Sequence, residues 1–474
     1  MNEFFRSALS LATAIKTKQI SPVEAARHYL KAVDRRNPTL NAIIWRRDDD
    51  LLKEARAAEA QVMRGDALAP FHGVPIPLKD LTEAVGQPTT HGSKVAAHKL
   101  GRYDSTVVTS LRQAGFLFMG RTNSPEFGSL PVTENALHGA TRNPWNSTKT
   151  PGGSSGGAAA AVAAGMAPIA HASDGGGSIR IPASCCGLVG LKATRGRIPR
   201  GPWVSEVMHG FSTDGCVSTT IADTAAMLDV LAHFDPTTWY GVAKPTTSFL
   251  AAARCRSPRL RIGVTTTGPL DVKAAPSAVE GVNKVAALLG ELGHQVTEVK
   301  VDWPLSSDQL AKDFMAVWCT SAAYHDFPDW SQAEPLNLAL RALSMAQSSH
   351  DYIKAVVRLQ LFSRKIVSSW GTASGGFDLL LTPTLAMEPP PIGWIFATGE
   401  TDPEKLLWRC SEMVPYTGWC NVTGQPAISL PSMESTNGLP IGVQLIAAPY
   451  REDFLLMVGT ELEEAIDWSR KLPI

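Results

Sequence analysis

The sequence predicts an α/β fold in which helices cover a central β-sheet. From about residue 70 onward, short apolar runs typical of buried strands alternate with segments of helical periodicity. The chain has 474 residues, 44% of them hydrophobic and 19% charged, a composition typical of folded proteins. We find no internal repeat and no low-complexity linker. We therefore expect one large domain, 66–474, on which an N-terminal helical segment, 1–65, is packed.

The N-terminal segment is predicted to be a pair of helices. Ser21, Pro22, Val23 and Glu24 form a capping box with proline at the first helical position. Apolar side chains then follow at helical spacing, and Asn37-Pro38 is expected to end the helix.

Strands and helices are expected to alternate through the rest of the chain. One helix should be capped by Asp104 and end at Gly115. A second should open with a capping box of Ser277 and Glu280 and run to Gly293. The expected strands are GVPIPLKDL (73–81), FLFMG (116–120), RLRIGV (259–264), FDLLLTPT (377–384) and the segment around GVQLIAA (442–448).

Charge and cysteine content exclude several classes of protein. The 44 basic and 44 acidic residues give a formal net charge of +0, which argues against a nucleic-acid-binding surface. The seven cysteines are odd in number and include no CxxC pair, so we expect neither a metal cluster nor a disulfide framework. The N-terminal residues lack a signal-peptide core and a membrane span. We expect a cytoplasmic protein with no cofactor, no metal and no membrane contact.

Two glycine clusters, GGSSGG (152–157) and DGGGS (174–178), lie close together in the sequence. Phosphate binding is one interpretation, but neither GxxxxGK[ST] nor GxGxxG is present. Tight turns and close helix packing are a second interpretation. The third is a nucleophile site, because consecutive N–H groups on a bare loop can converge on one oxyanion. In that case Ser178 attacks from the end of the loop.

A serine nucleophile needs a base, and no histidine motif supplies one. Lys79 stands inside the apolar run GVPIPLKDL, where lysine is rare. Burial would lower its pKa, because desolvation disfavours the charged amine. A plain ion pair between Lys79 and Asp80 is an equally open explanation at this point.

Taken together, these motifs resemble the amidase signature family. The distance from Lys79 to Ser154 is 75 residues, and that from Ser154 to Ser178 is 24, as in the family pattern. The likeness covers nearly the whole chain. Further segments that resemble the family are GRTNSPEFG (120–128), GATRNPWN (139–146), CGLVGLKAT (186–194), DLLLTPT (378–384) and NVTGQPAISLP (421–431).

The resemblance implies a set of roles. Ser178 matches the nucleophile, Lys79 the base, and Ser154 a bridging serine whose preceding peptide bond is cis. The amides of Gly175, Gly176 and Gly177, with that of Ser178, are implied to form the oxyanion hole. The implied fold is one large domain with a mixed, twisted central sheet surrounded by helices.

Other matches imply supporting parts. Ser155, Asp174 and Arg180 match positions that brace the nucleophile loop. Cys319 falls in the variable region that shapes the substrate pocket in such relatives, although cysteine is also common as core filling. In SDGGGS this chain has a glycine where many relatives have threonine.

The implied function is that of a serine hydrolase that cleaves small uncharged amides through an acyl-enzyme, with carbamates (urethanes) and esters as side substrates. Among family members, the sequence is most similar in character to stand-alone hydrolases of the nylon-oligomer and aryl acylamidase type. An amidotransferase A-type subunit, working in a multi-protein complex, is the alternative. A binding relative without activity is a third possibility. We expect a monomer or homodimer.

Overall fold

The computed structural model describes residues 3–370, 376–400, 402–468 and 472–473, and in this part of the chain the strands form two sheets. The larger sheet has eight strands in the order β4-β6-β5-β10-β11-β9-β7-β8, and the smaller has the order β1-β3-β2. Strand β7 pairs in parallel with β8 and β9, whereas the other pairs of the larger sheet are antiparallel. The predicted mixed central sheet is therefore confirmed.

The strands are β1 (Ile43–Arg46), β2 (Pro75–Lys79), β3 (Leu117–Thr122), β4 (Ile169–Asp174), β5 (Val189–Lys192), β6 (Thr213–Ser218), β7 (Arg261–Val264), β8 (Gln295–Glu298), β9 (Leu379–Pro383), β10 (Ala427–Glu434) and β11 (Pro440–Ala447). The helices are α1 (Ala8–Lys16), α2 (Pro22–Leu40), α3 (Asp48–Arg64), α4 (Thr106–Gln113), α5 (Gly156–Ala163), α6 (Arg180–Cys186), α7 (Ile221–Leu231), α8 (Phe249–Ala253), α9 (Pro276–Glu291), α10 (Ser307–Trp318), α11 (Thr320–Ala323), α12 (Pro335–Ala346), α13 (Ser349–Val367), α14 (Pro403–Met413), α15 (Gly418–Thr423) and α16 (Glu452–Ile466).

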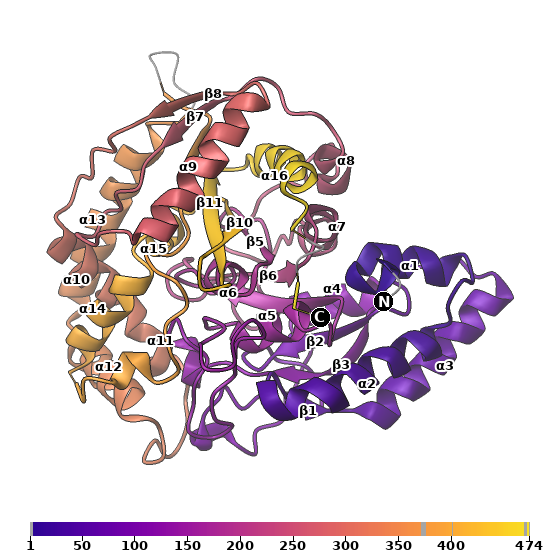
Figure 1. Cartoon of the computed structure of the whole chain (residues 1–474). Helices are drawn as coiled ribbons and strands as arrows, with labels where there is room; N and C mark the ends of the chain where they lie inside the picture. The colour runs from indigo at the N-terminus through magenta and orange to yellow at the C-terminus, as the bar shows by residue number, and fades with distance from the viewer. Residues whose placement is uncertain (1–2, 371–375, 401, 469–471, 474) are drawn as a thin grey trace.

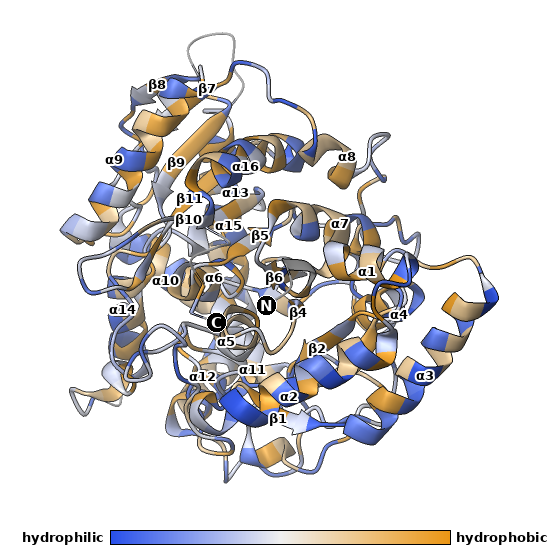
Figure 2. Ribbon diagram, turned by 45° about the vertical axis from the view of Figure 1, so that its right-hand side comes forward, coloured by the Kyte–Doolittle hydropathy of each residue, from blue (hydrophilic) through white to orange (hydrophobic). Residues whose placement is uncertain are grey.

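Helices cover both faces of the larger sheet (Figure 1). Because side chains alternate across a strand, β10 sends Ile428 and Leu430 into the cluster with α7, α9 and α16. Its neighbour Ala427 joins the opposite cluster, to which α10, α13 and α15 contribute. In Figure 2 strand β9 is coloured as hydrophobic, whereas α2 and α3 alternate between hydrophilic and hydrophobic residues. The central strands are thus buried on both sides, and α2 and α3 on one side.

Two prolines place helix ends differently from the prediction. Helix α2 does not stop at Asn37-Pro38 but continues to Leu40. Pro38 lies in the last turn, where the missing N–H removes a single hydrogen bond, and the helix closes with Asn41 in a left-handed conformation. Helix α9 starts at Pro276, so the predicted capping box of Ser277 and Glu280 lies within the helix rather than at its start.

The predicted cap of α4 is also wrong. Ser105, not Asp104, caps this helix and accepts a hydrogen bond from the Val108 N–H. The Asp104 carboxylate instead accepts from the Val85 N–H at 2.8 Å and from Arg112 Nε at 3.0 Å. Tertiary partners thus take the carboxylate away from the helix end.

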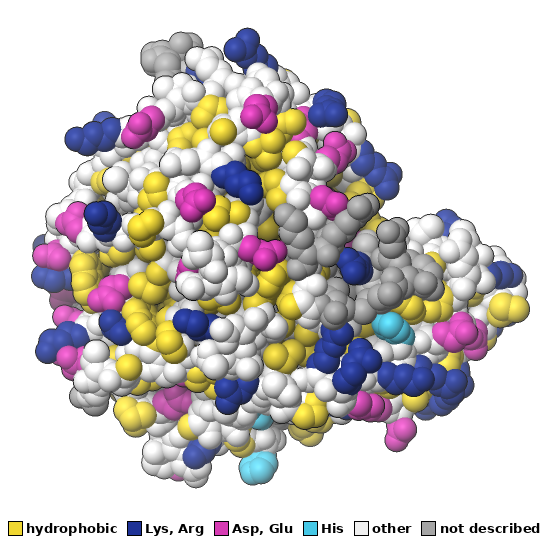
Figure 3. All heavy atoms as spheres, in the orientation of Figure 1, with side chains coloured by type: hydrophobic (Ala, Val, Ile, Leu, Met, Phe, Trp, Pro, Cys, Tyr) yellow, Lys and Arg dark blue, Asp and Glu magenta, His cyan; other side chains and the backbone are white. Residues whose placement is uncertain are grey.

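The molecular surface mixes charges of both signs. Figure 3 shows Lys, Arg, Asp and Glu side chains interspersed over the face in view, in keeping with the equal numbers of basic and acidic residues. None of the helices in the described residues is both long and apolar enough to cross a lipid bilayer.

Candidate active site

The candidate site lies where β2, β4 and the starts of α5 and α6 meet. Strand β2 lies against β4 and ends at Lys79. Strand β4 ends at Asp174 and runs into the glycine loop, after which α6 begins. The first glycine cluster leads into α5, whose small side chains pack on β4 and α6. The two glycine clusters are therefore neighbours in space as well as in sequence.

Lys79 is fully buried among hydroxyl groups. Its Nζ donates hydrogen bonds to Ser154 Oγ at 2.7 Å, Ser155 Oγ at 2.8 Å and Ser173 Oγ at 3.1 Å. Burial lowers the pKa of Lys79 to about 7, against the opposing influence of nearby carboxylates. An amine with such a pKa is largely uncharged slightly above neutral pH and can then accept a proton.

The alternative ion pair between Lys79 and Asp80 is wrong. The Asp80 carboxylate accepts hydrogen bonds from the Thr90 N–H at 2.9 Å and the Gly92 N–H at 3.1 Å. Successive residues of a strand point to opposite sides, so the end of β2 separates the amine from this carboxylate.

The Gly153–Ser154 peptide bond is cis, as the family resemblance implied. Gly153 is confined, because a Cβ on this residue would lie 2.5 Å from the Val132 carbonyl oxygen. The next residue, Ser155, donates its N–H to the Ser178 carbonyl at 3.3 Å. This bond ties the cis segment to the backbone of the predicted nucleophile, and the three serines 154, 155 and 178 are all buried.

The glycine loop is held by contacts at both ends of one peptide unit. The Gly176 carbonyl accepts a hydrogen bond from Thr417 Oγ1 at 2.7 Å, and the Gly177 N–H donates to Asp174 Oδ1 at 2.7 Å. Gly177 has φ +129°, and a Cβ there would lie 2.3 Å from Thr417 Oγ1, so only glycine fits. Within the described residues, the N–H groups of Gly175, Gly176 and Ser178 have no hydrogen-bond partner. The Gly177 amide, which the sequence also assigned to the oxyanion hole, is already engaged.

Asp174 and Arg180 form a fully buried, two-pronged ion pair. Arg180 Nε and Nη2 each lie 3.0 Å from an Asp174 oxygen, and the guanidinium also donates to Gln444 Oε1 and Asn421 Oδ1 at 2.7 Å. Burial alone would raise the pKa of Asp174, but the Arg180 charge holds it well below its ordinary value. The pair therefore braces the loop from β4 to α6 in its ionised form.

Sequence reasoning missed several of these contacts. Ser173 directly precedes Asp174 and was not singled out, although it bonds to Lys79. Gln444 carries the same signal that identified Lys79, a polar residue inside a buried strand, GVQLIAA. Thr417 belongs to no motif and could not have been found from the sequence.

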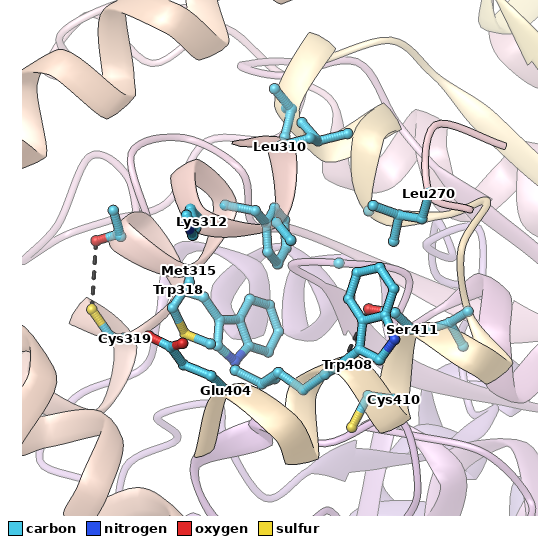
Figure 4. A pocket seen from close by; sticks show the side chains of 18 of the residues that line it. Leu270, Leu310, Lys312, Met315, Trp318, Cys319, Glu404, Trp408, Cys410 and Ser411 are labelled. Atoms are coloured by element: carbon cyan, nitrogen blue, oxygen red, sulfur yellow. Dashed lines mark hydrogen bonds between the residues drawn. The ribbon is translucent and has the colours of Figure 1, made fainter. Parts of the chain in front are cut away.

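A cavity of about 600 Å³ opens from the nucleophile loop. Gly176 and Ser178 belong to its lining, and helices α10, α12, α14 and α15 supply most of the rest. Figure 4 shows the side chains of Trp318 and Trp408 in this cavity. Cys319, predicted as a pocket residue, belongs to the lining. The lining also includes Leu270, Leu310, Phe314, Met315, Leu343, Leu407, Val414, Trp419 and Val422.

Charged side chains of the cavity lining are few and exposed. They are Asp308, Lys312 and Glu404, whose exposure places them at its mouth. In the described residues, no group of three or more His, Cys, Asp or Glu side chains is arranged to hold a metal ion.

Comparison with known proteins gives consistent matches over the whole chain. The profile of the amidase family matches residues 24–456. A 6-aminohexanoate-cyclic-dimer hydrolase of Pseudomonas sp. (strain NK87) is 34% identical, covering 99% of this chain and 97% of that protein. An acylamidase of Rhodococcus erythropolis is 33% identical, covering 100% and 98%. The structure of 6-aminohexanoate cyclic dimer hydrolase complexed with substrate superposes with a TM-score of 0.91 at 32% identity, covering 99% of both chains.

Proposed function

This chain belongs to the amidase signature family and is a hydrolase of amide C–N bonds, and from that premise we propose that it acts alone on uncharged amides through an acyl-enzyme on Ser178. The observation that carries the proposal is the buried Lys79 amine in contact with the Ser154 hydroxyl, next to a loop with unused N–H groups. The proposal includes activity as a monomer or homodimer in the cytoplasm.

The first half of the reaction is acylation. Neutral Lys79 accepts the Ser154 hydroxyl proton while Ser154 accepts that of Ser178, so that Lys79 becomes an ammonium ion. The Ser178 oxygen bonds to the amide carbonyl carbon, and the carbonyl oxygen becomes an oxyanion. The free N–H groups of Gly175, Gly176 and Ser178 stabilise this charge, and one such donor is worth about 3–4 kcal/mol of barrier. Gly177 instead fixes the loop through Asp174.

The second half returns the proton. Lys79 gives its proton back through Ser154 to the leaving nitrogen, the C–N bond breaks, and the amine departs. Water, deprotonated by the same relay, then attacks the Ser178 ester and releases the carboxylic acid. Ser155, Asp174 and Arg180 take no proton in this scheme, and they hold the two loops against each other.

The cavity supports amides that carry a bulky apolar group. Its lining is dominated by aliphatic and aromatic side chains, and its charged side chains are exposed at the mouth. A charged group deep in such a cavity would lose its hydration without compensation. We include Cys319 in the substrate-contacting wall. Carbamates and esters present the same carbonyl to the nucleophile and are proposed as side substrates.

The alternative, an amidotransferase A-type subunit, has less support. The relatives that match over nearly the full chain are named for hydrolysis of amides, and none of the three is named as a subunit of a complex. An inactive binding relative is also less supported, because Lys79, Ser154 and Ser178 are all present.

The proposal is tested with the purified chain alone on anilides of increasing acyl size, nylon oligomers and urethanes. We expect turnover of apolar anilides without a partner protein. Ser178→Ala should lose that turnover by about 10⁴-fold or more while its circular dichroism spectrum stays that of the parent. Retained turnover in Ser178→Ala, or activity only when a partner protein and an amide donor are added, would overturn the proposal.

A further inference from the structure

A second polar cluster lies beside Lys79, away from the three serines. The Lys79 backbone N–H donates to His171 Nδ1 at 3.4 Å, and His171 Nε2 lies 3.4 Å from Asp214 Oδ1. The other Asp214 oxygen is 3.0 Å from Arg200 Nε. Because Nδ1 accepts a hydrogen bond, the imidazole proton is on Nε2 and points toward the carboxylate.

This cluster has unused hydrogen-bonding capacity in a dry place. His171 and Asp214 are buried, with side-chain exposures of 1% and 5%. Among the described residues, His171 Nε2, Asp214 Oδ1 and Arg200 Nη1 have no hydrogen-bond partner of good geometry. Buried polar atoms are seldom left so, and each such group calls for an explanation. A charge that appears only during the reaction would supply one.

The charges around Lys79 leave one carboxylate free to respond to it. Of the groups that influence the amine, Asp174 is held by both prongs of Arg180. Burial keeps the pKa of His171 low, so the imidazole is uncharged. On the other side, Arg121 donates to the Lys79 carbonyl oxygen.

Asp214 stays ionised in these surroundings. Burial alone would raise the pKa of this carboxyl, but the Arg200 charge holds it below its ordinary value. The Asp214 carboxylate therefore faces the amine with a full negative charge and one oxygen to spare.

We propose that Asp214 is the counter-charge for the Lys79 ammonium that forms while Ser178 attacks, and that Arg200 limits its strength, so that the pair sets the pH range of the enzyme. This inference rests on the proposed function. During attack the proton moves from Ser178 through Ser154 to Lys79, which separates a buried cation from the oxyanion. A buried cation without a nearby anion is costly, and Asp214 lowers that cost through space. Asp214 and Arg200 are positioning residues that act only through Lys79.

The test measures how fast Ser178 reacts with a fluorophosphonate, a serine-directed reagent, as a function of pH. The readout requires no knowledge of the natural substrate. In the parent enzyme we expect the labelling rate to rise through a midpoint near the Lys79 pKa of about 7. Asp214→Asn removes the charge that favours protonated Lys79, so the midpoint should move to lower pH by about half a unit or more. The same variant should label several-fold more slowly at its plateau.

Arg200→Gln should move the midpoint in the opposite direction, to higher pH, because the cation that opposes Lys79 protonation is gone. Arg200→Lys keeps the charge and should stay near the parent midpoint. The matched control is Asp378→Asn, which breaks an Asp–Arg pair with Arg261 beside β7 and β9, far along the sheet order from β4 and β6. It should not move the midpoint.

Each outcome bears on a distinct claim. If Ser178→Ala is labelled as fast as the parent, the proposed function fails. If Ser178 is the labelled residue but Asp214→Asn and Arg200→Gln leave the midpoint unchanged, or move it in the same direction, the inference fails. Should Asp214→Asn not fold, the partly exposed Arg200 decides the matter alone, because an unmoved midpoint in Arg200→Gln overturns the inference.

Discussion

Two buried lysines stand at the ends of two strands, and only one of them contacts hydroxyl groups. Lys79 ends β2 and Lys192 ends β5, with exposures of 0% and 2%. Burial lowers the pKa of each to about 7. Lys79 Nζ contacts the hydroxyls of Ser154, Ser155 and Ser173, whereas Lys192 Nζ donates to the Ala193 carbonyl at 2.9 Å.

The difference teaches that a lowered pKa does not by itself make a base. Both amines give up a proton readily, but a backbone carbonyl has none to transfer, whereas a serine hydroxyl has. Lys192 lies near the Asp174 and Arg180 pair and feels both charges, so its place is in the scaffold behind the loop.

The largest expected effect separates the two lysines. Lys79→Met should lower the rate of anilide hydrolysis by about 10³-fold, because general base catalysis contributes about 10²–10⁴-fold. Lys192→Met, a swap of similar length in a buried site, should lose less than about tenfold. The measurement is kcat/KM for both variants at matched folding, judged by thermal unfolding. A loss in Lys192→Met as large as that in Lys79→Met would erase the distinction.

The next effect separates the two serines that accept from Lys79. Ser154→Ala breaks the proposed relay and should cost about 10²-fold or more in kcat, with KM little changed. Ser155→Ala removes one brace and should cost about tenfold. Equal losses in the two variants would argue that Lys79 reaches Ser178 without a preference for Ser154.

A pH effect of about tenfold sharpens the comparison further. Lys79 must be uncharged to accept a proton, and its pKa is lowered to about 7, so activity should be lost as pH falls through 7. The acylation rate should fall by about tenfold per pH unit well below that midpoint. Lys192→Met should keep the same acid limb, measured by stopped-flow at constant ionic strength. A limb that disappears in this variant would assign it to the wrong lysine.

The smallest expected effect concerns the loop clamp. Thr417→Val removes the hydroxyl that holds the Gly176 carbonyl, and should lower kcat by about tenfold or less without moving the acid limb. Thr417→Ser keeps the hydroxyl and should recover most of the activity. If Thr417→Ser is as slow as Thr417→Val, the methyl group rather than the hydrogen bond matters.

Local patterns predicted the parts of this site that depend on a few neighbouring residues. Lys79 was identifiable as a charged residue in an apolar strand, and the two glycine clusters as loops that need bare backbone. Thr417 was not, because the hydrogen bond to Gly176 joins residues 241 apart in the chain. The cap of α4 failed for the same reason, since contacts with Val85 and Arg112 decided between Asp104 and Ser105.

The Gly177 amide illustrates a further limit of the sequence. The resemblance offered four consecutive N–H groups for one oxyanion, and nothing in the sequence distinguishes them. The Asp174 carboxylate takes one of the four, because Arg180 holds it ionised beside the loop. Which amides remain is a matter of side-chain geometry that no motif encodes.

The most direct test of the account is titration of the Lys79 amine itself by NMR of the enzyme with ¹³C- and ¹⁵N-labelled lysine. The Lys79 and Lys192 signals are assigned by their loss in Lys79→Met and Lys192→Met. The account predicts that the Lys79 signal titrates near pH 7 with the same midpoint as the acid limb of acylation. A Lys79 amine that stays protonated above pH 9, or that titrates apart from the acid limb, would contradict it.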